Sequence, residues 1–129
     1  MIHIVVEHSE LVEAIGRRGD LDKATAEAAL TAVIATLAHG LTAPDRDRLA
    51  AALPAAVEEA ALVPGRPEHR PPDAVMIELA QRLDTGTERA RHLAQAVLAA
   101  LEDTAPGTGE LLRAALDVRG RDVSARGRA

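Results

Sequence analysis

The chain has 129 residues, of which 47% are hydrophobic, and a formal net charge of -5 at pH 7. The absence of cysteine excludes disulfides and cysteine-ligated metal sites. The absence of Phe, Trp and Tyr removes the rings that stack on single-stranded or flipped-out bases. This length suits one domain, with a core built from Leu, Val, Ile and Ala.

Residues 1–8 form an N-terminal extension before the first helical pattern. Residues 2–6 (IHIVV) are mostly β-branched, which is typical of a strand, although the sequence offers no partner strand. The extension lacks the positive region and cleavage site of a signal peptide, and no uncharged run is long enough to span a membrane. With the absence of cysteine, this indicates a cytoplasmic protein.

Residues 9–62 read as a first helical repeat. Ser9 is a suitable N-cap for a short helix that Gly19 would end, and Asp22 can cap a longer one. After the longer helix, Thr42 begins a capping box with Pro in the first turn. The apolar stripe of the longer helix has helical spacing and consists of Ala26, Leu30, Val33, Ile34, Leu37 and Leu41.

The third helix, which Thr42 begins, is interrupted at Pro54, and a further short helix follows it. Residues 63–72 (VPGRPEHRPP) contain four prolines and a glycine, which predicts an extended linker. Residues 73–118 read as a second helical repeat, with a capping box at 85–88 and a turn at 106–109. Its last apolar face consists of Leu111, Leu112, Ala115 and Leu116. Residues 119–129 are basic and aperiodic, which predicts a disordered tail.

The two halves share a pattern at an offset of 64 residues. AVIATL at 32–37 returns as AVLAAL at 96–101, and the same offset pairs Arg18 with Arg82. We therefore expect an all-α, compact helical bundle of two similar short-long-short helical repeats, joined by the Pro-rich linker into one domain. Chance likeness between Ala-rich helices is the alternative, and the matched polar positions argue against it.

This pattern resembles the bacterial family catalogued as domain of unknown function 2267 (DUF2267). The resemblance covers residues 9–118, and its main carriers are LAAALP at 49–54 and RHLAQAVLAAL at 91–101. Family members often carry an aromatic residue after the first LP segment, which is absent here, and Asp117 stands where the second copy would have Pro. The resemblance implies an all-helical fold of two similar halves and no established activity.

A second likeness is local. Residues 10–41 are similar to the N-terminal helix pair with which histone-like proteins of the HU type dimerise. The glycine-phenylalanine segment and the basic arms with which that family contacts DNA have no counterpart in this chain. The likeness therefore extends to the dimerising helices alone.

The polar residues show no catalytic or metal-binding constellation. The five histidines contain no HExxH motif and no paired ligand spacing, and the carboxylates are explained as helix caps and solvated side chains. Neither a phosphate-binding glycine loop nor a serine nucleophile motif is present. We expect a protein that is not an enzyme, has no metal or cofactor, and has no identified small-molecule substrate.

Fourteen of the fifteen basic residues are arginines, and five of them are candidates for an anion or nucleic-acid patch. Phosphate contact needs a local positive field rather than a positive total charge. Arg18 and Arg82 are the best candidates for a symmetric patch, because the repeat makes them equivalent. Dispersed arginines on a solvated surface are the alternative interpretation. The candidates are Arg17, Arg18, Arg82, Arg89 and Arg91.

Two functional hypotheses follow. The first is a protein–protein interaction or self-association module, including a homodimer, that uses remaining apolar helix surface. The second is a nucleoid- or RNA-associated accessory protein that contacts the phosphate backbone through arginines. The sequence identifies neither the partner nor the oligomeric state.

Overall fold

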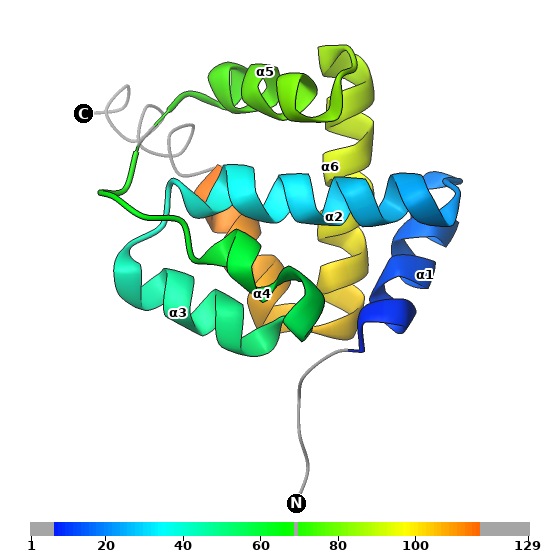
Figure 1. Ribbon diagram of the computed structural model, residues 1–129. Helices are drawn as coiled ribbons and strands as arrows, with labels where there is room; N and C mark the ends of the chain where they lie inside the picture. Colours follow the sequence, from blue (N-terminus) through cyan, green and yellow to red (C-terminus); the bar gives the residue numbers. More distant parts are fainter. Residues whose placement is uncertain (1–6, 69, 117–129) are drawn as a thin grey trace, which may run out of the picture.

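The computed structural model describes residues 7–68 and 70–116 (Figure 1). The strand expected at 2–6 and the tail at 119–129 lie outside these residues. Within the described ranges every regular element is a helix, so the all-α prediction is confirmed. A helical segment at 106–116 follows six labelled helices. They are α1 (His8–Gly19), α2 (Lys23–Ala38), α3 (Ala43–Ala52), α4 (Ala55–Ala61), α5 (Pro72–Leu83) and α6 (Thr87–Thr104).

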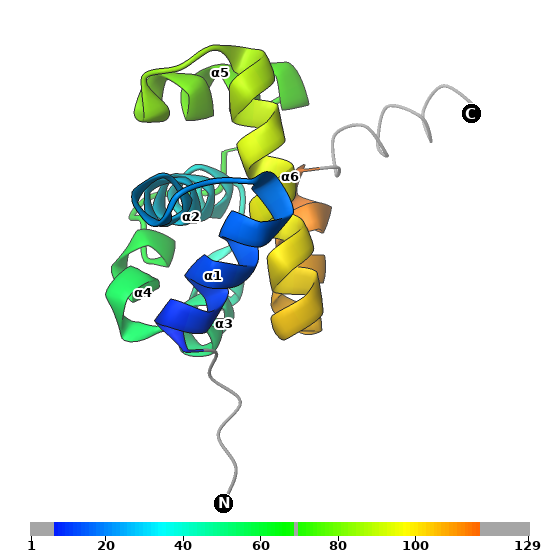
Figure 2. The ribbon, with the colours of Figure 1, turned by 90° about the vertical axis from the view of Figure 1, so that its right-hand side faces the viewer.

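The long helices α2 and α6 cross at the centre of the molecule. In Figure 1, α2 lies across the middle with α6 behind it, α5 above, and α3 and α4 below. Figure 2, turned by a quarter, shows α1 lying along α6. Each short helix of the pair α1 and α5 packs against both long helices. The helices of the first half therefore bury apolar surface against those of the second.

One hydrophobic cluster fills the space between the helices. The apolar stripe predicted for the longer helix of the first half is buried throughout. Leu112 from the segment 106–116 is also fully buried, as predicted for the last apolar face. The largest side chains that are buried completely come from both halves: Leu11, Ile15, Leu30, Ile34, Leu49, Leu79, Leu98, Leu101 and Leu112.

Two of the predicted helix starts are confirmed. The side chain of Asp22 accepts a hydrogen bond from the backbone amide of Thr25 (2.8 Å), and Thr42 accepts one from the amide of Asp45 (3.3 Å). Both bonds satisfy amides that the first turn of a helix leaves without an intrahelical partner. Pro54 separates α3 from α4, as its missing amide proton predicts.

The predicted ends of α1 were wrong. The helix begins at His8 with Glu7 as its N-cap, so Ser9 lies inside the first turn. Gly19 also lies inside the helix, and Asp20 is the left-handed residue that ends it (φ 57°). Glycine is needed at position 19 because of close packing against α6: a Cβ there would lie 3.0 Å from the Cβ of Ala96.

The second half departs from its predicted turns at two places. α6 begins at Thr87 with Gly86 as its N-cap, so no capping box forms at 85–88. The amide of Thr85 instead donates to the carbonyl oxygen of Ala80 (2.9 Å) and closes the end of α5. Residues 106–109 were predicted as a turn and are the first helical turn of 106–116. Pro106 suits that position, since a first turn does not use its amide.

Matching boundaries occur in the two halves. Asp20 and Asp84 are the two non-glycine residues with positive φ in the described part of the chain, and they end α1 and α5. The N-caps Asp22 and Gly86 are likewise separated by 64 positions. The internal repeat stays a prediction, because equal boundaries do not by themselves show that the halves superimpose.

Candidate functional site

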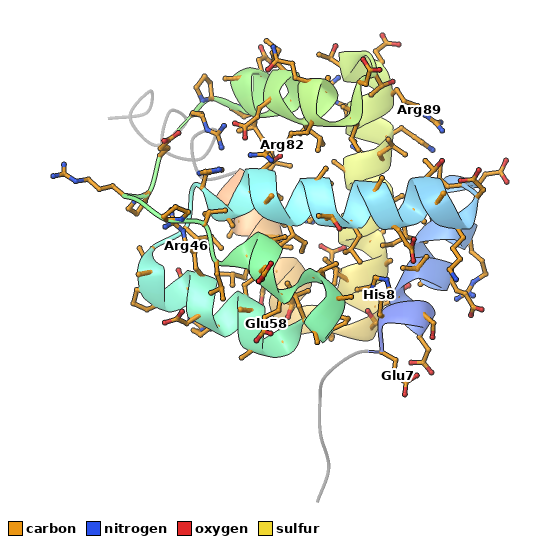
Figure 3. All side chains as sticks on the ribbon, viewed as in Figure 1. Glu7, His8, Arg46, Glu58, Arg82 and Arg89 are labelled. Carbon is orange, nitrogen blue, oxygen red and sulfur yellow. The ribbon has the colours of Figure 1, made fainter. Side chains whose placement is uncertain are left out.

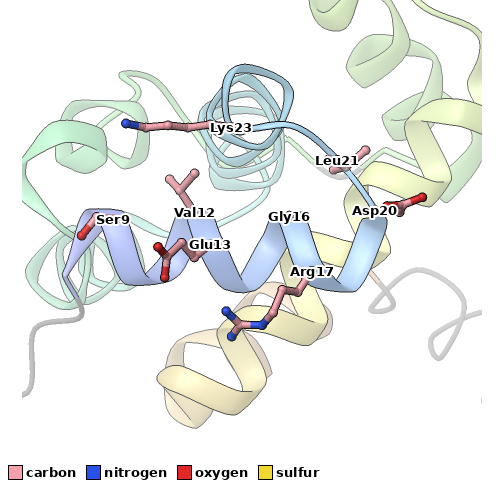
Figure 4. A pocket seen from close by; sticks show the side chains of 8 residues that line it. All are labelled: Ser9, Val12, Glu13, Gly16, Arg17, Asp20, Leu21 and Lys23. Atoms are coloured by element: carbon pink, nitrogen blue, oxygen red, sulfur yellow. The ribbon is translucent and has the colours of Figure 1, made fainter.

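A groove of about 720 Å³ lies between α1 and the start of α2 (Figure 4). Its apolar floor includes Val12, which is 3% exposed, and the partly buried Leu21. Its charged side chains have both signs, with two carboxylates and two cations. The lining residues are Ser9, Val12, Glu13, Gly16, Arg17, Asp20, Leu21 and Lys23.

The sharp turn after α1 shapes this groove. The amide of Leu21 donates back to the carbonyl oxygen of Gly16 (2.9 Å), which is the hydrogen bond of a Schellman ending. A Cβ at Gly16 would lie 3.0 Å from the carbonyl oxygen of Leu21, so a small residue lets the chain fold back closely. The sequence contains this signal as Gly16 followed by the left-handed Asp20. This signal was missed because the end of the helix was predicted at Gly19.

A second feature surrounds the C-terminal end of α2, where Arg46 is buried to 4% exposure. Its Nε donates to the carbonyl oxygen of Ala38 (2.8 Å), and its Nη1 donates to those of Val63 (2.8 Å) and Gly65 (2.7 Å). Its Nη2 donates to the carbonyl oxygen of His39 (3.2 Å). The guanidinium thereby satisfies carbonyls that the end of a helix leaves free, where the helix dipole favours a cation.

Sequence reasoning did not single out Arg46, although one signal was available. Arg46 lies three, four and seven residues before Leu49, Ala50 and Leu53, which are all buried. An arginine in the apolar stripe of a helix indicates a buried cation with dedicated acceptors.

Two further arginines reach the same end of α2 (Figure 3 shows Arg82 between α5 and α2). Arg70 donates to the carbonyl oxygen of Thr36 (2.9 Å) and forms an ion pair with Glu78. Arg82 also pairs with Glu78 (3.1 Å), and its Nη2 lies 3.5 Å from the Nε2 of His39. One carboxylate therefore holds two arginines from different segments over the helix end.

The five candidate arginines are distributed over three helices. Arg17 and Arg18 occupy the last turn of α1, and Arg18 forms an ion pair with Asp103 near the end of α6. Arg89 and Arg91 lie near the start of α6. Twelve residues of helix separate Asp103 from Arg91, which is roughly 18 Å at 1.5 Å per residue. Arg18 is therefore not brought together with that second pair.

Two tests for other kinds of site concern the described residues alone. In this part of the chain, no three His, Asp or Glu side chains are placed to hold a metal ion. None of its helices has both the length and the apolar character needed to cross a membrane. Fold and site together define a small all-α protein with a surface groove of mixed charge. Its second feature is the C-terminal end of α2, whose carbonyl oxygens accept hydrogen bonds from arginine side chains.

The profile of a family described as an uncharacterized conserved protein (DUF2267) matches residues 8–122. The chain belongs to this family, which confirms the family resemblance seen in the sequence. No curated protein and no solved structure shows significant similarity to the chain. The likeness of residues 10–41 to the HU type stays a prediction.

Proposed function

We propose that the protein is a non-enzymatic, cytoplasmic interaction module that associates with a second copy of itself through the α1–α2 groove. The observation that carries this proposal is the groove's arrangement of an apolar floor and charged side chains of both signs. An apolar centre with a polar rim is the usual anatomy of a protein interface. The internal repeat predicted from the sequence is consistent with this role.

Charge complementarity favours a second copy as the occupant. Arg17 and Glu13 lie one helical turn apart on α1 and both line the groove. In a twofold interface the same surface meets itself, so Arg17 of one copy can face Glu13 of the other. A surface with one sign of charge would repel its own copy, whereas this one offers both partners of each pair.

Charge reversal tests this arrangement. The oligomeric state is measured by size-exclusion chromatography with light scattering, because that method reports mass without aromatic absorbance. Arg17→Glu alone should convert dimer to monomer, and the double variant with Glu13→Arg should restore the dimer. Arg91→Glu, on an exposed site outside the groove, is the matched control and should leave the dimer intact.

A second surface provides a discriminating control. Ile77 on α5 is 50% exposed and does not line the groove. Dissociation by Ile77→Gln but not by Arg17→Glu would assign the interface to α5 and contradict the groove. A wild-type chain that stays monomeric at high concentration and captures no protein partner from its native host would contradict the interaction module itself.

Nucleic-acid binding is the second candidate function. Arg17, Arg89 and Arg91 make no ion pair with another residue of the described ranges, so their charge is available to phosphate. Arg18 and Arg82, the predicted symmetric pair, are each matched by a carboxylate, which reduces the positive field they offer.

Salt dependence tests this second candidate. Binding to duplex DNA should weaken steeply as the salt concentration rises. The double variant Arg89→Gln with Arg91→Gln should reduce the slope of log affinity against log salt concentration by the amount expected for the loss of about two phosphate contacts. Removal of residues 119–129 should lower the affinity further. Undetectable binding at low salt would reject the candidate.

A further inference from the structure

His39 lies at the C-terminal end of α2 and faces charged groups from three other segments. α3 contributes Arg46, and α5 contributes Arg82, which is paired with Glu78 on the same helix. The linker contributes Arg70 and Glu68, whose charges both act on His39. Arg70 also forms an ion pair with Glu78. The backbone amide of Glu68 donates to the carbonyl oxygen of His39 (2.7 Å), so the linker crosses directly over this residue.

The imidazole of His39 accepts from Arg82 only while it is neutral. Its Nε2 lies 3.5 Å from the Nη2 of Arg82, and a guanidinium nitrogen is always a donor. A protonated imidazole has two donors and no acceptor, so the contact would become a repulsion between two cations. This is the point at which the end of α5 meets the end of α2.

The corresponding contact on the other short helix has a different chemistry. Arg18 occupies the last turn of α1 as Arg82 occupies the last turn of α5, and Arg18 is paired with Asp103. Asp103 lies 64 residues after His39, which is the offset between the two arginines. The Arg18 contact is an ion pair with a carboxylate, whereas the Arg82 contact is made with an imidazole.

We propose that His39 and Arg82 form an acid-sensitive latch that holds the end of α5 on α2, while the corresponding contact of α1 joins the Arg18 guanidinium to the Asp103 carboxylate. When His39 gains a proton, its attraction for Arg82 becomes a repulsion, and α5 opens locally from α2. The latch is a property of the fold and does not depend on the proposed interaction.

The direction of the pH effect follows from the surroundings of His39. Burial lowers the pKa of His39 below its ordinary value of 6.5, and the positive charge of Arg70 lowers it further. Arg82 and Arg46 act in the same direction, and Glu68 opposes them. The open state therefore binds the proton more readily than the closed one. The latch is fully closed above pH 6.5 and weakens as the pH falls below that value.

Titration of the histidine ring signals by NMR on the full chain tests the pairing. The His39→Gln variant identifies the signal of His39 by its loss. In Arg82→Gln the midpoint of the His39 titration should move to higher pH, because a cation has been removed. A midpoint that stays unchanged would overturn the latch, since a purely structural Arg82 would leave it in place.

Amide hydrogen exchange tests the opening. In the wild-type chain the protection of α5 should fall between about pH 7.5 and about pH 5.5, across the range where histidine titrates, while the last turn of α1 stays protected. His39→Gln should abolish this loss, and so should His39→Asp, which places a carboxylate where the other contact has one. Equal protection of α5 at both pH values, or a loss that persists in His39→Gln, would overturn the proposal.

Discussion

Arg46 connects three segments of the chain. It is buried on α3 and donates to the end of α2 and to the linker at residues 63–66. In these contacts the guanidinium of Arg46 pairs with backbone carbonyl oxygens and not with a carboxylate. The segment read as a linker from its prolines is therefore held against the helices at residues 63–66 by this side chain.

Replacement of Arg46 tests that role. Arg46→Ala leaves buried carbonyls without donors, and we expect a loss of about 3 kcal/mol in the free energy of unfolding. Arg46→Lys should lose less stability than Arg46→Ala, because the ammonium keeps the charge. It should still be less stable than the wild type, because a single ammonium cannot reach both sets of carbonyls. Arg48→Ala is the control on the same helix, and should stay within about 0.5 kcal/mol. Urea unfolding followed by far-ultraviolet circular dichroism measures all three, and equal losses for Arg46 and Arg48 would contradict the role.

Gly19 is the second residue whose role is decided by distance. A Cβ there would lie 3.0 Å from that of Ala96 on α6 and 2.9 Å from the Cδ1 of Leu21, so Gly19→Ala should destabilise the fold by about 1–3 kcal/mol. Gly107 is helical with open space around it, and Gly107→Ala should stabilise by about 0.5–1 kcal/mol. Thermal unfolding of both variants gives the sign directly, and a neutral Gly19→Ala would show that α1 can shift away from α6.

At the scale of the elements, α2 illustrates how a cap contributes to stability in a pH-dependent way. Hydrogen bonds from the side chain and the backbone amide of Thr25 lower the pKa of Asp22 below its ordinary value of 3.8. The folded state therefore favours the carboxylate. Its stabilising contribution is present above pH 3.8 and is lost as the pH falls through the lower folded-state pKa.

The Asp22 cap predicts a contrast between two variants. Asp22→Ala should be less stable than the wild type near neutral pH, and the difference should shrink under acid conditions as the wild-type carboxylate is protonated. Asp22→Asn retains an accepting oxygen that does not titrate, so its stability relative to Asp22→Ala should not change with pH. Unfolding midpoints across the acid range measure both differences. A wild-type advantage over Asp22→Ala that persists at the lowest pH would contradict the cap.

Helix positions were predictable from sequence where a local signal decides them. Asp22, Thr42 and Pro54 act within one turn, and apolar stripes report burial directly. The left-handed Asp20 was missed because the nearby Gly19 is the usual residue for such an end, and only the approach of α6 shows why glycine is needed there.

The candidate site was less predictable than the helices. The five arginines are exposed, and their role as an anion patch stays a prediction. The partner of Arg82, Glu78, lies four residues earlier on the same helix, whereas the partner of Arg18 depends on how helices cross. The groove was missed for the same reason, since residues from two elements and their connecting turn form it. The helical spacing between Arg46 and Leu49 indicated that Arg46 is buried. This inference requires that a cation be counted as part of an apolar stripe.

At the scale of the whole molecule, the halves depend on each other. α1 packs against α6 from the second half, and α5 packs against α2 from the first. The amide of Glu68 and the guanidinium of Arg70 also reach carbonyls of α2. Neither half can bury its short helix fully against its own long helix, so a single core extends across both.

Separated halves therefore should not fold. A cut between Pro67 and Glu68 leaves the Arg46 contacts within the first fragment and divides the core. We expect residues 1–67 and 68–129 to show little helicity alone and to regain it on mixing, because each supplies the surface that the other must cover. Far-ultraviolet circular dichroism of the separate and mixed fragments measures this. A fragment that is helical and unfolds cooperatively by itself would show that one half has its own core, and the interdependence of the two halves would then be wrong.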